Sequence, residues 1–143
     1  YSNTLVVLEV TGEVLKLALE QCARYFAVNN GEVSIASSFL EPKEAHYNFD
    51  YFSGIDYVYD LSKPEGELVA SITRNGIPVQ PQDKMTLCMC DYRATGAGDF
   101  EFYTTCRRVR EIQTEVSDLI LNYFMEHPDV EIPEGHPCKT ILP

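Results

Sequence analysis

The chain has 143 residues, about the length of one domain, and its 45% hydrophobic and 23% charged residues are ordinary globular composition, which argues against a disordered tail. Eleven Lys and Arg residues stand against 22 Asp and Glu residues, so the formal net charge is −11 at pH 7. A surface this acidic repels phosphate backbones and anionic lipid, so we expect no nucleic acid polymer as a partner and no polybasic docking on a membrane.

No run approaches the ~18 apolar residues of a membrane-spanning helix, so no membrane insertion is expected in this segment. The chain starts with Tyr1 directly before an apolar run and has no signal peptide, which indicates a piece of a longer protein.

The first half of the chain alternates short apolar runs with turn residues. Leu5–Val10 predicts a buried strand, and apolar residues at helical spacing then predict an amphipathic helix from about Gly12 to Ala27. Asn29-Asn30-Gly31 is expected to end that helix with residues that tolerate left-handed geometry. The stretch that follows, to about Phe52, is predicted to be irregular with one short strand.

The middle of the chain favours antiparallel strands. Tyr57–Leu61 and Glu67–Thr73 are rich in β-branched and aromatic residues, with turn chemistry at 63–66 between them. Asn75-Gly76 is the strongest hairpin signal in the chain and joins Glu67–Thr73 to a strand at Ile77–Val79.

The last third predicts a strand at Met85–Cys90, a loop over 91–99, and a second helix capped by Thr114. The apolar stripe of this helix consists of Val116, Leu119, Ile120, Tyr123 and Phe124. Residues from about 128 to 143 carry prolines and acids and are predicted to be a tail. We therefore expect one domain over 1–143, of α+β class, with a mixed, largely antiparallel sheet packed by two main helices.

The five cysteines are an odd number, so at least one thiol is unpaired within a monomer. Cys88 and Cys90 would point to one face of a strand and could serve a metal, although buried packing thiols are the commoner outcome. The spacing shows no Cys-x-x-Cys pair, and the redox compartment stays open.

A search for catalytic machinery finds none. His46, His127 and His136 are scattered, with no His-Glu-x-x-His pair, so no metal site is predicted. The sequence has no P-loop and no Gly-x-Ser-x-Gly elbow, and Ser53 has no obvious base partner. No residue of this chain is predicted to be catalytic.

A binding-type pattern is present instead. The segment from Tyr92 to Asp99 places an aromatic residue and Arg93 at a strand end and then continues through Gly96 and Gly98. Glycines let backbone approach a ligand closely, an aromatic rim can stack on a flat heterocycle, and a carboxylate can accept ribose hydroxyls. A bulged turn with a half-buried Tyr would explain the same residues, so both interpretations are open at this point.

Four segments in order resemble the C-terminal domain of the 5′-nucleotidase family, which includes the 2′,3′-cyclic-nucleotide 2′-phosphodiesterases. They are Tyr1-Ser2-Asn3-Thr4-Leu5 into Glu9-Val10-Thr11-Gly12; Ser53-Gly54-Ile55 through Asn75-Gly76-Ile77-Pro78-Val79; Asp91-Tyr92-Arg93-Ala94-Thr95-Gly96-Ala97-Gly98; and Val109-Arg110-Glu111-Ile112-Gln113-Thr114. The Tyr92-Arg93-Ala94 form resembles the branch that joins cyclic phosphodiesterase and nucleotidase activity.

The resemblance implies a nucleoside site. It places the two aromatics that sandwich the base at Tyr1 and Tyr92, with Asn3 near the base edge. The family's ribose-binding Asp follows a Gly-Gly pair, whereas here Ala97 interrupts that pair, so either Asp99 or Gly98 takes the ribose position. Arg93 has no assured role and could instead form a salt bridge.

The resemblance also implies a division of labour. The domain would bind nucleotides or nucleosides, and an N-terminal metallophosphoesterase domain of the same chain, with two divalent metal ions of the Zn or Mn type, would hydrolyse 2′,3′-cyclic, 3′- or 5′-nucleotides. This segment alone would be inactive and hold no cofactor, and the protein would be secreted, periplasmic or on the cell surface. The alternatives are a stand-alone nucleoside-binding module and a purely structural domain in which Tyr92 is packing.

Overall fold

The computed structural model describes residues 2–131 and 134–143, and it divides into two compact units. One unit contains the chain up to Val14 together with Gln82–Gly135, and the other contains Leu15–Pro81 and His136–Pro143.

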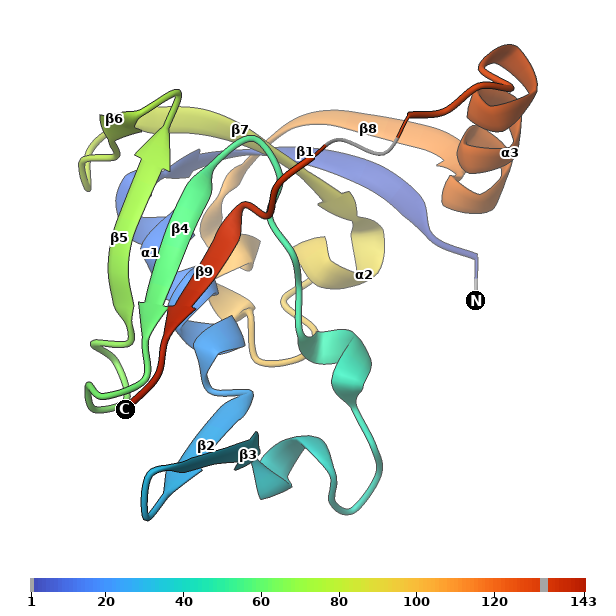
Figure 1. Ribbon diagram of the computed structural model, residues 1–143. Coiled ribbons are helices and arrows are strands. Elements are labelled where there is room, and N and C mark those ends of the chain that lie inside the picture. Colours follow the sequence, from blue (N-terminus) through green and yellow to red (C-terminus); the bar gives the residue numbers. More distant parts are fainter. Residues whose placement is uncertain (1, 132–133) are drawn as a thin grey trace. The chain divides into compact units, whose positions relative to one another are not determined.

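The first unit is built on a three-stranded antiparallel sheet of order β7-β1-β8 (Figure 1). The strands are β1 (Thr4–Thr11), β7 (Lys84–Cys90) and β8 (Arg107–Glu115). Successive residues of a strand face opposite sides of the sheet, and Val6, Leu8 and Val10 of β1 are all almost fully buried. The predictions of strands at Leu5–Val10 and Met85–Cys90 are confirmed.

Short helices and one longer helix complete this unit. They are α2 (Asp91–Ala94), the 3₁₀ helix η3 (Glu101–Thr105) and α3 (Val116–Glu126). The prediction that Thr114 caps α3 is wrong, because β8 continues through Thr114 to Glu115. The Val116 amide donates instead to the carbonyl of Asn3, the residue before β1, at 2.8 Å, so this backbone carbonyl satisfies the first amide of the helix. The predicted apolar stripe is largely exposed, with Tyr123 at 51% and Phe124 at 54%.

The helix α1 (Gly12–Ala23) begins in the first unit, which includes the chain up to Val14, and its residues from Leu15 on belong to the second unit. It ends four residues earlier than predicted, because β2 (Phe26–Asn29) pairs with β3 (Glu32–Ile35). Asn30 and Gly31 have φ angles of 53° and 83°, so they form the turn of this hairpin and do not end the helix. The 3₁₀ helices η1 (Ser37–Phe39) and η2 (His46–Asn48) follow.

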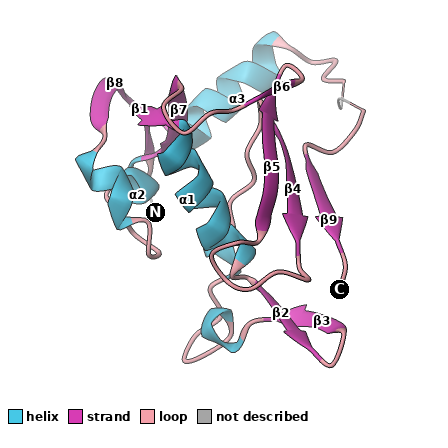
Figure 2. Ribbon diagram, turned by 90° about the vertical axis from the view of Figure 1, so that its left-hand side faces the viewer, coloured by secondary structure: helices cyan, strands magenta, loops and turns pink. Residues whose placement is uncertain are grey.

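The second unit also holds a four-stranded sheet of order β6-β5-β4-β9, and α1 lies along one of its faces (Figure 2). The strands are β4 (Asp56–Asp60), β5 (Val69–Arg74), β6 (Ile77–Pro78) and β9 (Cys138–Ile141). The hairpin at Asn75-Gly76 is confirmed, with φ angles of 52° and 76°.

The strand β9 corrects the prediction of a tail over 128–143. It pairs in parallel with β4, and the amides of Tyr57 and Leu61 donate to the carbonyls of Pro137 and Ile141. This parallel pair makes the sheet mixed, while the other strand pairs are antiparallel. The α+β class with a largely antiparallel, mixed arrangement is therefore confirmed.

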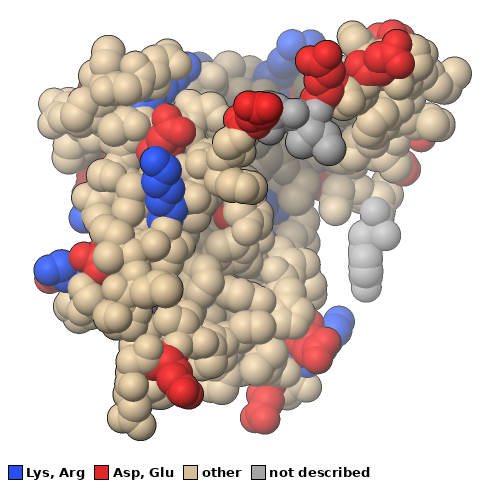
Figure 3. Space-filling model, viewed as in Figure 1, with Lys and Arg blue, Asp and Glu red and all other residues tan. Residues whose placement is uncertain are grey.

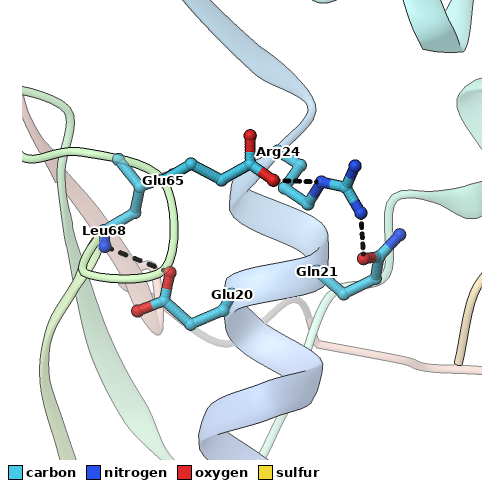
Figure 4. A network of polar contacts seen from close by, with 5 residues as sticks. All are labelled: Glu20, Gln21, Arg24, Glu65 and Leu68. Atoms are coloured by element: carbon cyan, nitrogen blue, oxygen red, sulfur yellow. Dashed lines mark hydrogen bonds and ion pairs between the residues drawn. The ribbon is translucent and has the colours of Figure 1, made fainter.

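The apolar face of α1 contributes buried side chains to the core of the second unit. Leu15, Ala18, Leu19 and Cys22 are at most 1% exposed. Glu20, which is 9% exposed, accepts the amide of Leu68 at 3.1 Å (Figure 4). Its other carboxylate oxygen accepts the amide of Val69 at 2.9 Å. This carboxylate ties the helix to the start of β5, since a buried acid needs such partners.

On the face drawn in Figure 3, the described Lys and Arg side chains are scattered among Asp and Glu and form no continuous basic surface. Among the described residues, no helix is both long enough and apolar enough to span a bilayer.

Candidate functional site

The candidate site is the segment 91–99, which follows β7 in the first unit. Its first four residues form α2, where a loop was expected. The Thr95 hydroxyl donates to the Tyr92 carbonyl at 2.7 Å, and the Gly96 amide donates to the Arg93 carbonyl at 3.0 Å. The helical turn thus ends at once in the glycine-rich loop.

The loop itself depends on left-handed backbone. Gly96, Gly98 and Asp99 have φ angles of 87°, 77° and 68°. A β-carbon on Gly96 would lie 3.0 Å from both Glu101 Cα and Thr104 Cγ2, so the loop packs directly against η3. Asp99 is exposed and stands in a conformation that Asp tolerates better than most residues.

Arg93 lies inside this loop. It is 4% exposed, and its guanidinium carbon lies 4.2 Å from the centroid of the Phe100 ring. Its Nη1 donates to the carbonyl of Ala97, between the two loop glycines. Phe100 is itself fully buried and stacks on Tyr103, with ring centroids 5.7 Å apart and an interplanar angle of 11°. The loop is therefore built around a buried cation–π stack.

Tyr92 differs from its buried neighbours because its side chain points outward and is 43% exposed. The guanidinium carbon of Arg93 lies 5.8 Å from its ring centroid, toward the edge of cation–π range. A half-exposed aromatic at a loop rim can stack on a planar ligand.

The strand β1 brings Asn3 to the same end of the sheet as Tyr92, because Leu5 pairs with Cys90 in the antiparallel register. Six predicted site residues, namely Asn3, Tyr92, Arg93, Gly96, Gly98 and Asp99, therefore belong to one unit. The seventh, Tyr1, lies outside the described residues.

Two residues of the site, Asp91 and Phe100, were not predicted from the sequence. Asp91 accepts the backbone amides of Thr4 and Tyr92 with one carboxylate oxygen, at 3.1 and 3.0 Å. Phe100 supplies the ring beneath Arg93. An Asp in the first turn of a helix is a common sequence signal because its carboxylate can accept the free backbone amides there, and this signal could have identified Asp91.

The thiols form no comparable site. In the part of the chain that the structure describes, no cysteine forms a disulfide bond, and Cys22 is buried while Cys88 is exposed. Among the described residues, no three His, Cys, Asp or Glu side chains come close enough together to hold a metal ion.

Fold and site together define an α+β domain that presents an aromatic residue and a glycine-rich loop at one end of a sheet. The family model of the 5′-nucleotidase C-terminal domain matches residues 1–127, and the chain belongs to this family.

Two curated relatives are nucleotide phosphoesterases. The chain is 35% identical over 109 residues to the 2′,3′-cyclic-nucleotide 2′-phosphodiesterase/3′-nucleotidase of Haemophilus influenzae, a match covering 67% of this chain and 17% of that protein. It is 25% identical over 142 residues to the trifunctional nucleotide phosphoesterase protein YfkN of Bacillus subtilis, covering 91% of this chain and 10% of that protein.

One solved structure is similar over almost the whole chain. A Staphylococcus aureus protein assigned as a 5′-nucleotidase, crystallised with alpha-ketoglutarate, superposes with a TM-score of 0.92 at 35% identity. The match covers 99% of this chain and 28% of that one. The chain thus spans between 10% and 28% of the length of these three proteins.

Proposed function

We propose that this chain is the nucleoside-recognition domain of a nucleotide phosphohydrolase that acts on 2′,3′-cyclic nucleotides and on 3′- or 5′-nucleotides. The observation that carries the proposal is the half-exposed ring of Tyr92 at the rim of a glycine-rich loop. Family membership supports the substrate class, since the Haemophilus influenzae relative is named for 2′,3′-cyclic nucleotides and 3′-nucleotides.

Each site residue has a defined part in this proposal. The Tyr92 ring stacks on the base, and Tyr1 covers the opposite face by resemblance to the family. Asn3 lies near the base edge. Asp99 accepts the ribose hydroxyls, or the backbone at Gly98 takes that place. The close packing of Gly96 on η3 supports a loop of fixed shape.

Arg93 acts in this proposal from beneath the loop. Its burial and its bond to the Ala97 carbonyl support a bracing role, in which the guanidinium keeps the glycines shaped for the ribose. At 4% exposure the guanidinium is largely closed off from a phosphate outside the loop, which favours the bracing role.

Hydrolysis belongs to a second domain in this proposal. A metallophosphoesterase domain, N-terminal to this one in the same polypeptide and outside the cell membrane, holds two divalent metal ions. When bound in that domain, the ions would supply a polarised water and charge stabilisation for the phosphate. The described residues bring no metal-binding group together, so they do not fit a metal pair, and this chain contributes positioning alone.

The inactivity of the chain is a direct consequence. We expect no phosphatase activity from the purified 143-residue chain with Mn²⁺ or Zn²⁺, measured by phosphate release from 3′-AMP, 5′-AMP and 2′,3′-cyclic AMP. Robust turnover by pure chain that a chelator abolishes would contradict the two-domain proposal.

Binding is tested by NMR titration of the chain with adenosine. We expect saturable shifts at residues 92–99 and near Asn3, with millimolar-range affinity because adenosine carries no phosphate and only its base and ribose can contribute contacts. Loss of the Tyr92 ring should weaken binding about 5- to 150-fold, the equivalent of ~1–3 kcal/mol of stacking.

The matched control is Tyr51→Ala. Tyr51 is a more exposed tyrosine, at 75%, and it lies in the other unit. The control variant should bind adenosine as the wild type does. Equal affinity of Tyr92→Ala and the wild type would refute the proposed stacking role.

A further inference from the structure

Asp91 joins two segments that are distant in sequence. Its Oδ1 accepts the amide of Thr4, 87 positions away, at 3.1 Å and the amide of Tyr92 at 3.0 Å. Hydrogen bonds to an ionised acceptor are roughly twice as strong as neutral ones. One carboxylate oxygen therefore fixes the backbone of Tyr92 relative to the start of β1.

This bridge lies where the sheet ends. The last backbone pair between β1 and β7 is Leu5 with Cys90, and beyond it the Asp91 side chain takes over the acceptor role of a partner strand. Without it, the Thr4 amide would need another acceptor. The side chain thus extends the pairing of β1 by one residue toward Asn3.

The opposite edge of the same segment is held by the start of α3. The Asn3 carbonyl accepts the Val116 amide at 2.8 Å, and the Ser2 hydroxyl donates to Glu115 Oε1 at 2.6 Å. Residues 2–4 are therefore hydrogen-bonded on both sides. The start of α3 binds one side, and the Asp91 carboxylate binds the side that faces Tyr92.

We propose that Asp91 is a positioning residue of the nucleoside site, which sets the spacing between Tyr92 and the segment that carries Asn3 without touching the nucleoside. This inference rests on the proposed function, because it assumes that Asn3 and Tyr92 contact the same ligand. A base stacked on Tyr92 meets Asn3 only if the two backbones keep this spacing.

The test compares Asp91→Ala and Asp91→Asn in the 143-residue chain. Alanine removes the acceptor, whereas asparagine keeps one carbonyl oxygen that can accept both amides. We expect the Asp91→Ala change to shift the amide protons of Thr4 and Tyr92 upfield and to weaken adenosine binding about 5- to 30-fold, as loss of one to two hydrogen bonds implies. Asparagine should restore the affinity to within about threefold of wild type.

The control is Asp60→Ala. Asp60 Oδ1 likewise accepts two hydrogen bonds, from the amide and hydroxyl of Ser62 at 3.0 and 2.6 Å, but it lies in the second unit. This variant should leave the amide shifts of Thr4 and Tyr92 and the adenosine affinity unchanged, which separates loss of a local turn from loss of the bridge.

The outcomes are distinct. Failure of the wild type to bind adenosine refutes the proposed function, and the Asp91 inference with it. Wild-type binding with unchanged affinity in Asp91→Ala overturns the Asp91 inference alone. A third outcome is that both Asp91 variants lose adenosine affinity equally while the amide shifts of Asp91→Asn stay native. This result would assign Asp91 a direct, charge-dependent contact with the nucleoside, and it would also overturn the inference. If Asp91→Ala does not fold, Asp91→Glu decides by the same two readouts, because it keeps a carboxylate but displaces it by one methylene group. Displaced amide shifts with unchanged adenosine affinity in that variant would overturn the inference.

Discussion

Substitution of Gly96 by alanine tests whether the binding loop is locked onto η3. Gly96 has a φ angle of +87°, and an added β-carbon would meet the backbone Cα of Glu101 and the side chain of Thr104, each at 3.0 Å. Glu101 Cα belongs to the main chain of a helical turn and cannot rotate away, so the loop or η3 must shift.

The expected loss in the free energy of unfolding of Gly96→Ala has two parts. An alanine at this φ angle costs ~1–2 kcal/mol in backbone strain, partly offset by the lower entropy of the unfolded chain. Forcing a methyl group into a packed position adds ~1–3 kcal/mol. We therefore expect Gly96→Ala to lower the free energy of unfolding by about 2–4 kcal/mol and to weaken adenosine binding at the displaced loop.

The matched control is Gly66→Ala. Gly66 has a φ angle of +88°, and nothing lies within 4 Å of its added β-carbon. It should show the strain alone, about 1 kcal/mol. Urea unfolding followed by far-UV circular dichroism measures both variants, and similar losses for the two glycines would refute the claim that Gly96 is packed against η3.

Three other predictions concern stability. Glu20→Ala leaves two buried backbone amides without their carboxylate and should lower the free energy of unfolding by about 2–4 kcal/mol in urea unfolding. Glu65→Ala, which loses an exposed ion pair, should cost less than about 1 kcal/mol, and equal costs would contradict the role of Glu20 in holding α1 to β5. Burial raises the pKa of Tyr57 to about 12 from 10.0, so the folded state holds this proton more tightly, and up to about 3 kcal/mol of stability present below pH 10 should be lost between pH 10 and 12. Tyr57→Phe should flatten that slope in unfolding titrations, and an unchanged slope would argue against it. Deletion of residues 138–143 removes a paired strand and should lower the free energy of unfolding by about 2–4 kcal/mol; an unchanged midpoint would mean that β9 contributes nothing.

Sequence patterns within a few residues correctly predicted those turns and strands whose conformation depends mainly on neighbouring residues. The Asn75-Gly76 hairpin is confirmed because both residues adopt the positive φ angles that a two-residue turn requires. Leu5–Val10 is confirmed as a strand because its alternating apolar residues fill one face of a sheet.

Long-range pairing explains the errors. The spacing up to Ala27 continues a helical pattern, yet Phe26 begins a strand because a partner strand follows the Asn30 turn. Thr114 has the chemistry of a cap, but β1 keeps β8 extended past it. The parallel strand Cys138–Ile141 pairs with residues about 80 positions upstream, and no local pattern reports such a partner.

The candidate site divides in the same way. Its glycines, Tyr92 and Asp99 stood out by residue type and spacing. The burial of Arg93 on the Phe100 ring depends on how the loop folds back, which spacing alone does not give. The bridge from Asp91 to Thr4 depends on the register of β1 and β7, so only the folded sheet reveals it.

The most direct test of the nucleoside site is the set of intermolecular nuclear Overhauser effects in the chain saturated with adenosine. The account predicts contacts from the adenine H2 and H8 protons to the ring of Tyr92, and from the ribose protons to the amides of Gly98 and Asp99. Contacts confined to other exposed aromatics such as Tyr47 or Tyr51, with none to Tyr92, would contradict it.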